Sequence, residues 1–340
     1  MSSDMIIENG VLVDASPTTG LVVIPDGVTK IAEGAFYGCQ GITKVIIPDS
    51  VKSIEYNAFK ACSQLTSVVI GNGLESIGPW AFDSCYNLTS INIPDSVTSI
   101  GQNAFDNCLL LAYEIVGGVK YLGKWAIDAS NDFVANIKLR DGTIGIAGTA
   151  FECRTYLKSI TIPDGVKTIG AYAFRHCIHL RSITIPDSVT SIDRDAFQYC
   201  YGLTSIVLPD SLKRIEWYTF EECHSLKSKV ANYKAFQITS FGKLKCLDKI
   251  YKEGRKSSVR GELKLCHNGI HYCTNLYEIF DYYYGEIDKD IAIYECDVSD
   301  ENIGQVYLGE ECSSKRCARW IIPRKRLHRE DVIRILNGGE

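Results

Sequence analysis

The sequence predicts a solenoid built mainly from β-structure, and three observations lead to this prediction. Ile or Leu followed by Pro-Asp, Ser or Gly, and an apolar residue recurs at 23 residues or multiples of 23. An Ile, a Phe and a Leu return at fixed positions within each unit, and the residues before the Pro alternate between apolar and polar. A strict period of this length is typical of repeat proteins, in which each unit packs mainly on its neighbours.

The units are numbered here from the residue before the Pro, which is position 1. Position 1 holds Ile24, Ile47, Ile70, Ile93, Val116, Leu139, Ile162, Ile185 and Leu208. Position 13 holds Phe36, Phe59, Phe82, Phe105, Phe151, Phe174, Phe197 and Phe220. We therefore predict an N-terminal cap at 1–23, nine units at 24–230, and a small α+β C-terminal domain at 231–340.

Each unit carries its own folding signals. Leu-x-x-Ile-x-Ile, as in Leu180 to Ile185, has the period of two expected of a half-buried strand. The following Pro lacks a backbone donor and ends the strand, and Asp with Ser or Gly favours a turn. Val-x-x-Ile then predicts a second short extended segment, and Ala-Phe-x-x-Cys predicts a tight helical or 3₁₀ corner. Stacked units would share one core.

These residues resemble the BspA-type leucine-rich repeats of bacteria, whose signature is Ile-Pro-x-x-Val-x-x-Ile-x-x-x-Ala-Phe-x-x-Cys. The resemblance covers roughly residues 20–230. It implies a curved leucine-rich-repeat solenoid with a parallel sheet on the concave face. It also implies a family used for adhesion and protein recognition, frequently on cell surfaces.

The fifth unit departs from the pattern. After Cys108 the motif runs one residue early through Leu110, Tyr113 and Ile115, and Ala126-Ile127 stands where Ala-Phe is expected. A one-residue shift inside a strand would turn its inward face outward, so we expect loops to absorb the slip. Two interpretations remain open, which are neutral drift in loops and a local change that displays a loop to a partner.

The outward residues of the main strands, at positions 21 and 23, form the predicted binding surface. The candidate partner-binding residues are Lys44, Ser67, Ser90, Asn92, Asn136, Lys138, Ser159, Thr161, Ser182, Thr184 and Ser205. They are small, weakly polar or β-branched, which strand propensity alone also favours. Nine strands about 4.8 Å apart would give a face about 40 Å long, sufficient for a protein partner. None of these residues suggests catalysis.

Eight of the fourteen cysteines belong to the repeats. Seven share position 16, and Cys153 lies one place early. A spacing set by the repeat predicts buried, reduced thiols that pack as small apolar side chains rather than disulfides or metal ligands.

The C-terminal segment predicts strands around Leu263–Leu265 and Ile287–Val298. Apolar residues at helical spacing predict a helix in Asn275–Tyr284, and a second short helix begins at Arg329 and stops at Gly338. Cys266, His267, His271 and Cys273 suit zinc by type but lack the paired Cys-x-x-Cys spacing, with Cys312 and Cys317 as possible additions. Ordinary buried thiols are the favoured interpretation, so we predict no metal and no cofactor.

The stretch beginning at Gly261 resembles an uncharacterised small domain of bacteria and their phages. The match covers roughly residues 233–327, with Ile270 in place of a Phe and Leu276 in place of a Pro. It implies no activity. The layout is also similar to that of ADP-ribosyltransferases, but their Ser-Thr-Ser segment and a matching Glu are missing.

Composition limits the function classes. The chain has 36 Lys and Arg against 41 Asp and Glu. Residues 231–340 hold 18 and 17 of these, which leaves 18 and 24, or a net charge of −6, for residues 1–230. An acidic repeat region argues against nucleic-acid binding, apart from a local basic run at 315–329. We find no apolar run long enough to span a membrane and no secretory signal, so a cytoplasmic location is expected, or the cell surface if a leader is missing.

We therefore predict a non-enzymatic scaffold that binds a protein or glycan on the concave repeat face. The alternative is a repeat-targeted effector whose C-terminal domain is an enzyme, ADP-ribosyltransferase-like in its most concrete form, or a zinc-binding module.

Overall fold

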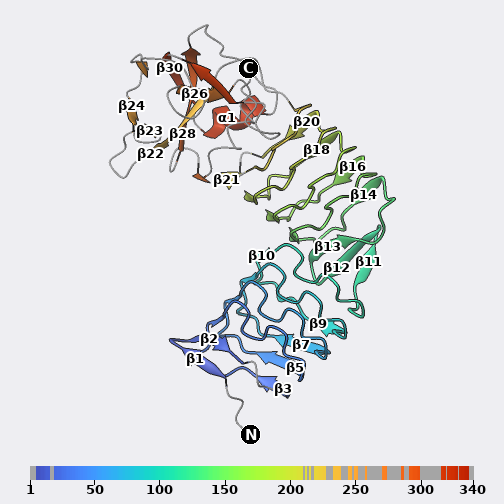
Figure 1. Cartoon of the computed structure of the whole chain (residues 1–340). Helices are drawn as coiled ribbons and strands as arrows, with labels where there is room; N and C mark the ends of the chain where they lie inside the picture. The colour runs from blue at the N-terminus through green and yellow to red at the C-terminus, as the bar shows by residue number, and fades with distance from the viewer. Residues whose placement is uncertain are drawn as a thin grey trace. The chain divides into compact units, whose positions relative to one another are not determined.

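The computed structural model describes residues 5–15 and 19–226 except 210, 213, 216 and 217, and beyond residue 226 only the strands and one helix. The chain divides into two compact units, 1–175 and 176–340. Within each unit, Figure 1 shows successive turns of chain with parallel strands, which we call coils and number after their repeat units.

The main strands form what we call the first ladder, at the predicted Leu-x-x-Ile-x-Ile segments. Its strands are β3 (Gly20–Val23), β5 (Ile42–Ile47), β7 (Ser67–Ile70), β9 (Ser90–Ile91), β14 (Asn136–Lys138), β16 (Ser159–Thr161), β18 (Ser182–Thr184) and β20 (Ser205–Val207). Equivalent residues of neighbouring coils pair in parallel, as Val45 does with Val68. The ladder is continuous over β3, β5, β7 and β9, and resumes as the pairs β14–β16 and β18–β20.

The predicted second extended segment is also present, as two-residue strands that form the second ladder. These are β4 (Lys30–Ile31), β6 (Ser53–Ile54), β8 (Ser76–Ile77), β10 (Ser99–Ile100), β15 (Gly145–Ile146), β17 (Thr168–Ile169), β19 (Ser191–Ile192) and β21 (Arg214–Ile215). At the N-terminal end, β1 (Ile6–Glu8) and β2 (Val11–Asp14) form an antiparallel hairpin, and β2 pairs in parallel with β4. The hairpin therefore covers the edge of this ladder.

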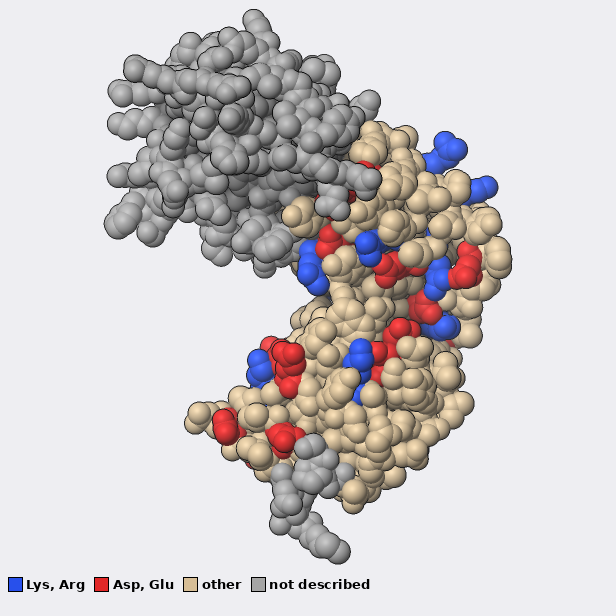
Figure 2. All heavy atoms as spheres, in the orientation of Figure 1, with Lys and Arg blue, Asp and Glu red and all other residues tan. Residues whose placement is uncertain are grey.

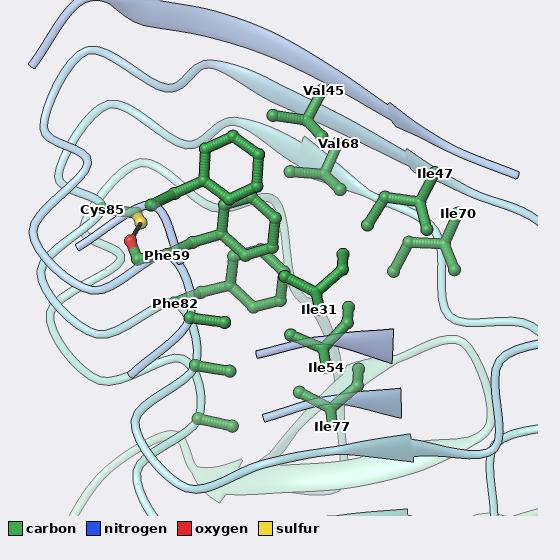
Figure 3. Close-up of a cluster of buried hydrophobic side chains, with 14 of the residues drawn as sticks. Ile31, Val45, Ile47, Ile54, Phe59, Val68, Ile70, Ile77, Phe82 and Cys85 are labelled. Carbon is green, nitrogen blue, oxygen red and sulfur yellow. Dashed lines mark hydrogen bonds between the residues drawn. The ribbon is translucent and has the colours of Figure 1, made fainter. Parts of the chain in front are cut away.

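The core lies between the two ladders and the corner. Phe36, Phe59 and Phe82 are fully buried, and their rings stack with centroids 4.6 and 5.0 Å apart. Figure 3 shows these rings beside rows of Ile and Val from the two ladders. A stacked arrangement follows directly from the repeat, because residues 23 apart occupy equivalent places in neighbouring coils. The predicted common core is confirmed.

The corner differs from the prediction in its backbone. It is tight, as expected, but it is a run of turns rather than a helix or 3₁₀ segment. Positions 11 and 15 both have positive φ, between 52° and 67°, in eight of the nine units. A left-handed residue interrupts helical geometry, and two of them within five residues bend the chain sharply.

The fifth unit is where the prediction was wrong. No slipped coil is present. The chain instead forms a three-stranded antiparallel meander of β11 (Glu114–Val116), β12 (Val119–Leu122) and β13 (Trp125–Ala129), which we call the fifth-unit hairpin or, below, the hairpin. Ala126-Ile127 lies within β13 and not in a corner. Only the start of β13 rejoins the stack, where Trp125 and Ala126 pair in parallel with β15.

Two of the inward residues predicted around this hairpin were also wrong, since Leu110 is 57% exposed and Ile115 is 61% exposed. Val119 and Leu122 are buried, as predicted. Leu111, which the unshifted 23-residue period places at position 19, is buried instead of Leu110. The period therefore continues unbroken to Leu111, and the chain then leaves the solenoid path.

Beyond coil nine, the described elements are mainly strands. They are β22 (Tyr233–Ile238), β23 (Leu244–Cys246), β24 (Lys249–Tyr251), β25 (Ser257–Ser258), β26 (Ile270–Cys273), β27 (Gly285–Glu286), β28 (Ile291–Val298), β29 (Lys315–Ala318), β30 (Trp320–Leu327) and α1 (Arg329–Leu336). β28 and α1 confirm a predicted strand and a predicted helix. The predicted helix at Asn275–Tyr284 and strand at Leu263–Leu265 lie outside the described residues.

Candidate functional site

The outward face of the first ladder, which we call the ladder face, carries all eleven predicted partner-binding residues. Their side chains alternate with buried ones, as in β16, where Ser159 and Thr161 are exposed on either side of buried Ile160. They also lie in rows, and the longest such row is Lys44, Ser67 and Ser90. That these residues bind a partner, and that this face is concave, stay predictions.

Several of these side chains bond to one another along the rows. Ser90 Oγ donates to Ser67 Oγ at 3.2 Å, and Ser159 Oγ donates to Asn136 Oδ1 at 2.7 Å. The Asn92 amide bonds to both backbone groups of Ile70, each at 2.7 Å, and so extends the pairing beyond the end of β9. Asn92 therefore has a structural role that the sequence did not reveal.

The rest of the ladder face is apolar and carries few charges. Val69 is 44% exposed and Val207 is 48% exposed on β7 and β20. Lys44 and Lys138 are the charged members of the predicted set. On the face of the molecule drawn in Figure 2, acidic and basic side chains lie intermingled rather than in a patch of one sign. A surface of exposed methyl and hydroxyl groups suits a protein partner's side chains better than a phosphate or a metal ion.

A second candidate site lies where the fifth unit lacks a corner. A cleft of about 530 Å³ lies between corner four and corner six, within the range of small-ligand sites. The hairpin contributes Tyr113, Lys120 and Asp128 to its lining. Sequence reasoning missed this site, and the one local signal was Arg154, which takes position 16 where seven other units have a buried Cys.

Most charged groups of the cleft are paired, and the exception is Asp106, whose carboxylate accepts from the Asn107 N–H. Asp128 accepts from Lys120 Nζ at 2.8 Å and from Arg154 at 2.6 Å. Arg154 also pairs with Asp132, and Glu152 pairs with Arg175 at 3.1 Å. Burial raises the pKa of the Tyr113 hydroxyl well above its ordinary value, so Tyr113 is neutral at physiological pH. The cleft therefore offers a ligand mainly neutral hydrogen-bonding groups.

Seven of the eight repeat cysteines are buried, as predicted. Each thiol that is fully described donates to a backbone carbonyl of the preceding coil, as Cys85 does to Phe59 at 3.1 Å (Figure 3). Burial raises the pKa of the Cys108 thiol to about 12. The eighth, Cys153, is exposed, so the prediction of a buried thiol was wrong for it. It lies at position 15, whose side chain points outward.

The candidate metal ligands of the C-terminal segment are only partly described. Cys266, His267 and Cys312 lie outside the described residues. His271 and Cys273 belong to β26, and the strand register pairs His271 with Cys317 of β29. Over the residues whose side chains are described, no group of three His, Cys, Asp or Glu suits a metal ion. Among the described helices, none is long and apolar enough to cross a membrane.

The chain matches the family described as BspA type leucine rich repeat region, in six copies over residues 17–134 and 144–252. Residues 230–333 match a domain of unknown function. No curated protein matches the chain.

Solved bacterial structures are similar to part of the chain. A leucine rich repeat protein of T. pallidum is 25% identical, covers 58% of this chain and 74% of its own, and has a TM-score of 0.27. A leucine rich cell surface protein from Faecalibacterium prausnitzii is 25% identical, with 61% and 77% covered and a TM-score of 0.31. The pneumococcal vaccine antigen PcpA is 21% identical, with 61% and 73% covered and a TM-score of 0.31.

Proposed function

Because the chain belongs to the BspA-type leucine-rich repeat proteins, we propose that it is an interaction scaffold and that a partner protein binds across its ladder face. Solenoids of this kind present extended surfaces for recognition. The single observation that carries the proposal is the outward row at position 21, in which exposed Lys44, half-buried Ser67 and exposed Ser90 lie in register on adjacent parallel strands.

The chemistry of the row supports a protein partner. Its hydroxyl groups are already bonded along the row, so they resist dehydration less than free polar groups would. Exposed Val69 and partly buried Ile46 alternate with the row at position 23 and supply apolar area. A surface with apolar area, satisfied polar groups and few charges has the composition of a protein interface core. A glycan would instead need unbonded hydroxyl or amide groups and exposed aromatic rings on this face.

The proposal is tested by placing two long charged side chains in the row. Ser67→Arg combined with Ser90→Arg should lower partner affinity at least tenfold, because the two added positive charges would have to be desolvated in the interface. Affinity capture with the full chain identifies the partner, and titration calorimetry measures the loss.

The matched control is Thr29→Arg combined with Thr98→Arg. Both threonines are exposed at position 6, where other units already carry Lys52 and Lys167. The control should bind as the wild type does, and circular dichroism should show that both variants fold. Equal binding by the ladder variant and the wild type would show that the partner binds elsewhere.

A further inference from the structure

We propose that the cleft at the fifth unit binds an extended, uncharged peptide segment of a partner protein. This site is separate from the ladder face and does not depend on the function proposed for it. The hydrogen bonds that join neighbouring corners show which backbone groups the cleft leaves without a partner.

Intact corners are joined by three backbone bonds. The N–H groups of positions 11, 13 and 15 donate to the carbonyls of positions 10, 12 and 14 of the next coil. For corner three these are the bonds from Trp80, Phe82 and Ser84, each 2.8 or 2.9 Å long. Each corner is thus bound on both sides by the peptide groups of its neighbours.

Corner four lacks a following corner and makes a different set of contacts. Asn103 N–H donates to Thr149 Oγ1 at 3.0 Å, so the two walls of the cleft meet at this end. Asn107 N–H turns back to the carboxylate of Asp106. Phe105 N–H has no acceptor among the described residues, and Phe105 lines the cleft.

Corner six forms the opposite wall. Its Glu152 carbonyl is equivalent to the Asp106 carbonyl, which accepts from Ser84 N–H. No donor among the described residues bonds to the Glu152 carbonyl. Arg154 Nε is also buried with no acceptor among the described residues. The cleft therefore presents an unmatched backbone donor on one wall and an unmatched backbone acceptor on the other.

These two groups identify the class of ligand. At every intact corner, the equivalent donor and acceptor bind the peptide groups of another coil. Apart from Asp106, whose carboxylate accepts from the Asn107 N–H, the charged side chains around them are paired with one another, so the cleft offers a ligand mainly neutral groups. A peptide supplies both a carbonyl and an N–H in one chain.

Exposed apolar side chains lie in the lining of the cleft and close to it in the chain. Leu109 follows corner four and is 74% exposed. Phe133 and Tyr156 are 74% and 52% exposed, and their rings lie 5.3 Å apart beside the hairpin and coil six. Contiguous exposed apolar side chains of this size mark interaction sites. We therefore expect the bound segment to carry at least one large apolar residue.

The probe is a library of uncharged nine-residue peptides displayed on phage and selected against the full chain. A selected peptide should bind once per chain, and it should slow hydrogen exchange of the Phe105 amide at least tenfold. Cys153→Tyr should weaken binding at least tenfold, because it places a bulky ring at the mouth of the cleft. Tyr199 occupies the same corner position in coil eight, so the coil accepts this side chain.

The matched control is Ser84→Tyr, the same substitution at the same position of intact corner three, which should leave binding unchanged. In the wild type, bound peptide should also protect Cys153 from alkylation, measured by mass spectrometry on the tryptic fragment 141–154. The proposal is overturned if no uncharged peptide is selected or if selected peptides bind Cys153→Tyr as tightly as the wild type. It is equally overturned if Cys153 stays unprotected, or if a glycan array yields the ligand that Cys153→Tyr excludes.

Discussion

At the scale of single residues, the corner depends on backbone angles more than on side-chain identity. Positions 11 and 15 hold glycine in coil one, at Gly34 and Gly38, but Asn, Trp, Thr, Tyr, Ala, Ser and other residues elsewhere. A left-handed conformation costs about 1–2 kcal/mol for a residue with a Cβ. The inter-coil hydrogen bonds and the buried Phe of each corner offset that cost.

Ala61 offers a direct test, because it has φ of 60° and carries only a methyl group. Ala61→Gly should raise the free energy of unfolding by about 1 kcal/mol, since relief of the left-handed strain exceeds the added entropy of the unfolded chain. Urea unfolding followed by circular dichroism measures the change.

Ala58→Gly is the matched control within the same corner, because Ala58 is buried and does not have positive φ. Here the added entropy of the unfolded chain and the loss of a buried methyl group act in the same direction, and the free energy of unfolding should fall by about 1–2 kcal/mol. A fall in both variants would refute the assignment of strain to position 15.

At the scale of elements, each coil is held by a column of identical side chains. Phe59 stacks on Phe36 and Phe82, whereas Phe105 is described with one stacked neighbour, Phe82, at 5.6 Å. The hairpin places Ile127 rather than a ring near this end of the column. The stack of Phe rings is therefore interrupted where the fifth unit departs from the repeat.

Phe59→Ala should lower the free energy of unfolding by about 3–5 kcal/mol, because it opens a cavity in the middle of the column. Phe105→Ala should cost about 1 kcal/mol less, since it removes one stacked pair instead of two. Urea denaturation of the two variants under identical conditions gives the comparison. Equal losses would indicate that ring stacking contributes little beyond burial.

Most of the repeat fold could be predicted because the same signal occurs many times. The alternation around Ile160 or Val68 is local, and each unit repeats it, so an error in one unit is corrected by the others. The fifth unit could not be read in this way. Ala126-Ile127 resembles a degraded corner, and only its antiparallel pairing with β12, which is a non-local contact, makes it a strand.

The same difference, between local signals and contacts with a neighbouring coil, separates the parts of the candidate sites that could be predicted from those that could not. Exposure of Ser159 and Thr161 follows from strand periodicity and was predicted. The bond from Asn92 to Ile70 and the cleft beside Arg154 depend on what lies in the neighbouring coil. A single unit of sequence contains no information about such contacts.

At the scale of the whole solenoid, both ladders are interrupted at the fifth unit. β9 ends the first continuous sheet of the first ladder, and β10 ends that of the second. Direct links between coils four and six include the bond from Gly148 N–H to the Ile100 carbonyl, 2.9 Å long, and the contact of Asn103 with Thr149. In a solenoid, cooperativity passes through such interfaces between neighbours.

We therefore expect coils one to four to open separately from coils six and seven. Phe59→Ala should speed hydrogen exchange of amides in coils one to four by about 100-fold or more, given its expected energetic cost. Amides of coil seven, such as that of Gly170, which is bonded to Ile146 of coil six, should exchange as in the wild type. Hydrogen–deuterium exchange with mass spectrometry resolves the two regions, and uniform acceleration would show a single cooperative unit instead.

In the first ladder, equivalent side chains of neighbouring strands are separated by a constant distance. Side chains of one type recur at the spacing of parallel strands, about 4.8 Å. A ligand that is itself repetitive at that spacing can match Lys44, Ser67 and Ser90 step for step. The ladder is interrupted between β9 and β14. Such a ligand can therefore match only the strands on one side of this interruption, which limits the length that binds.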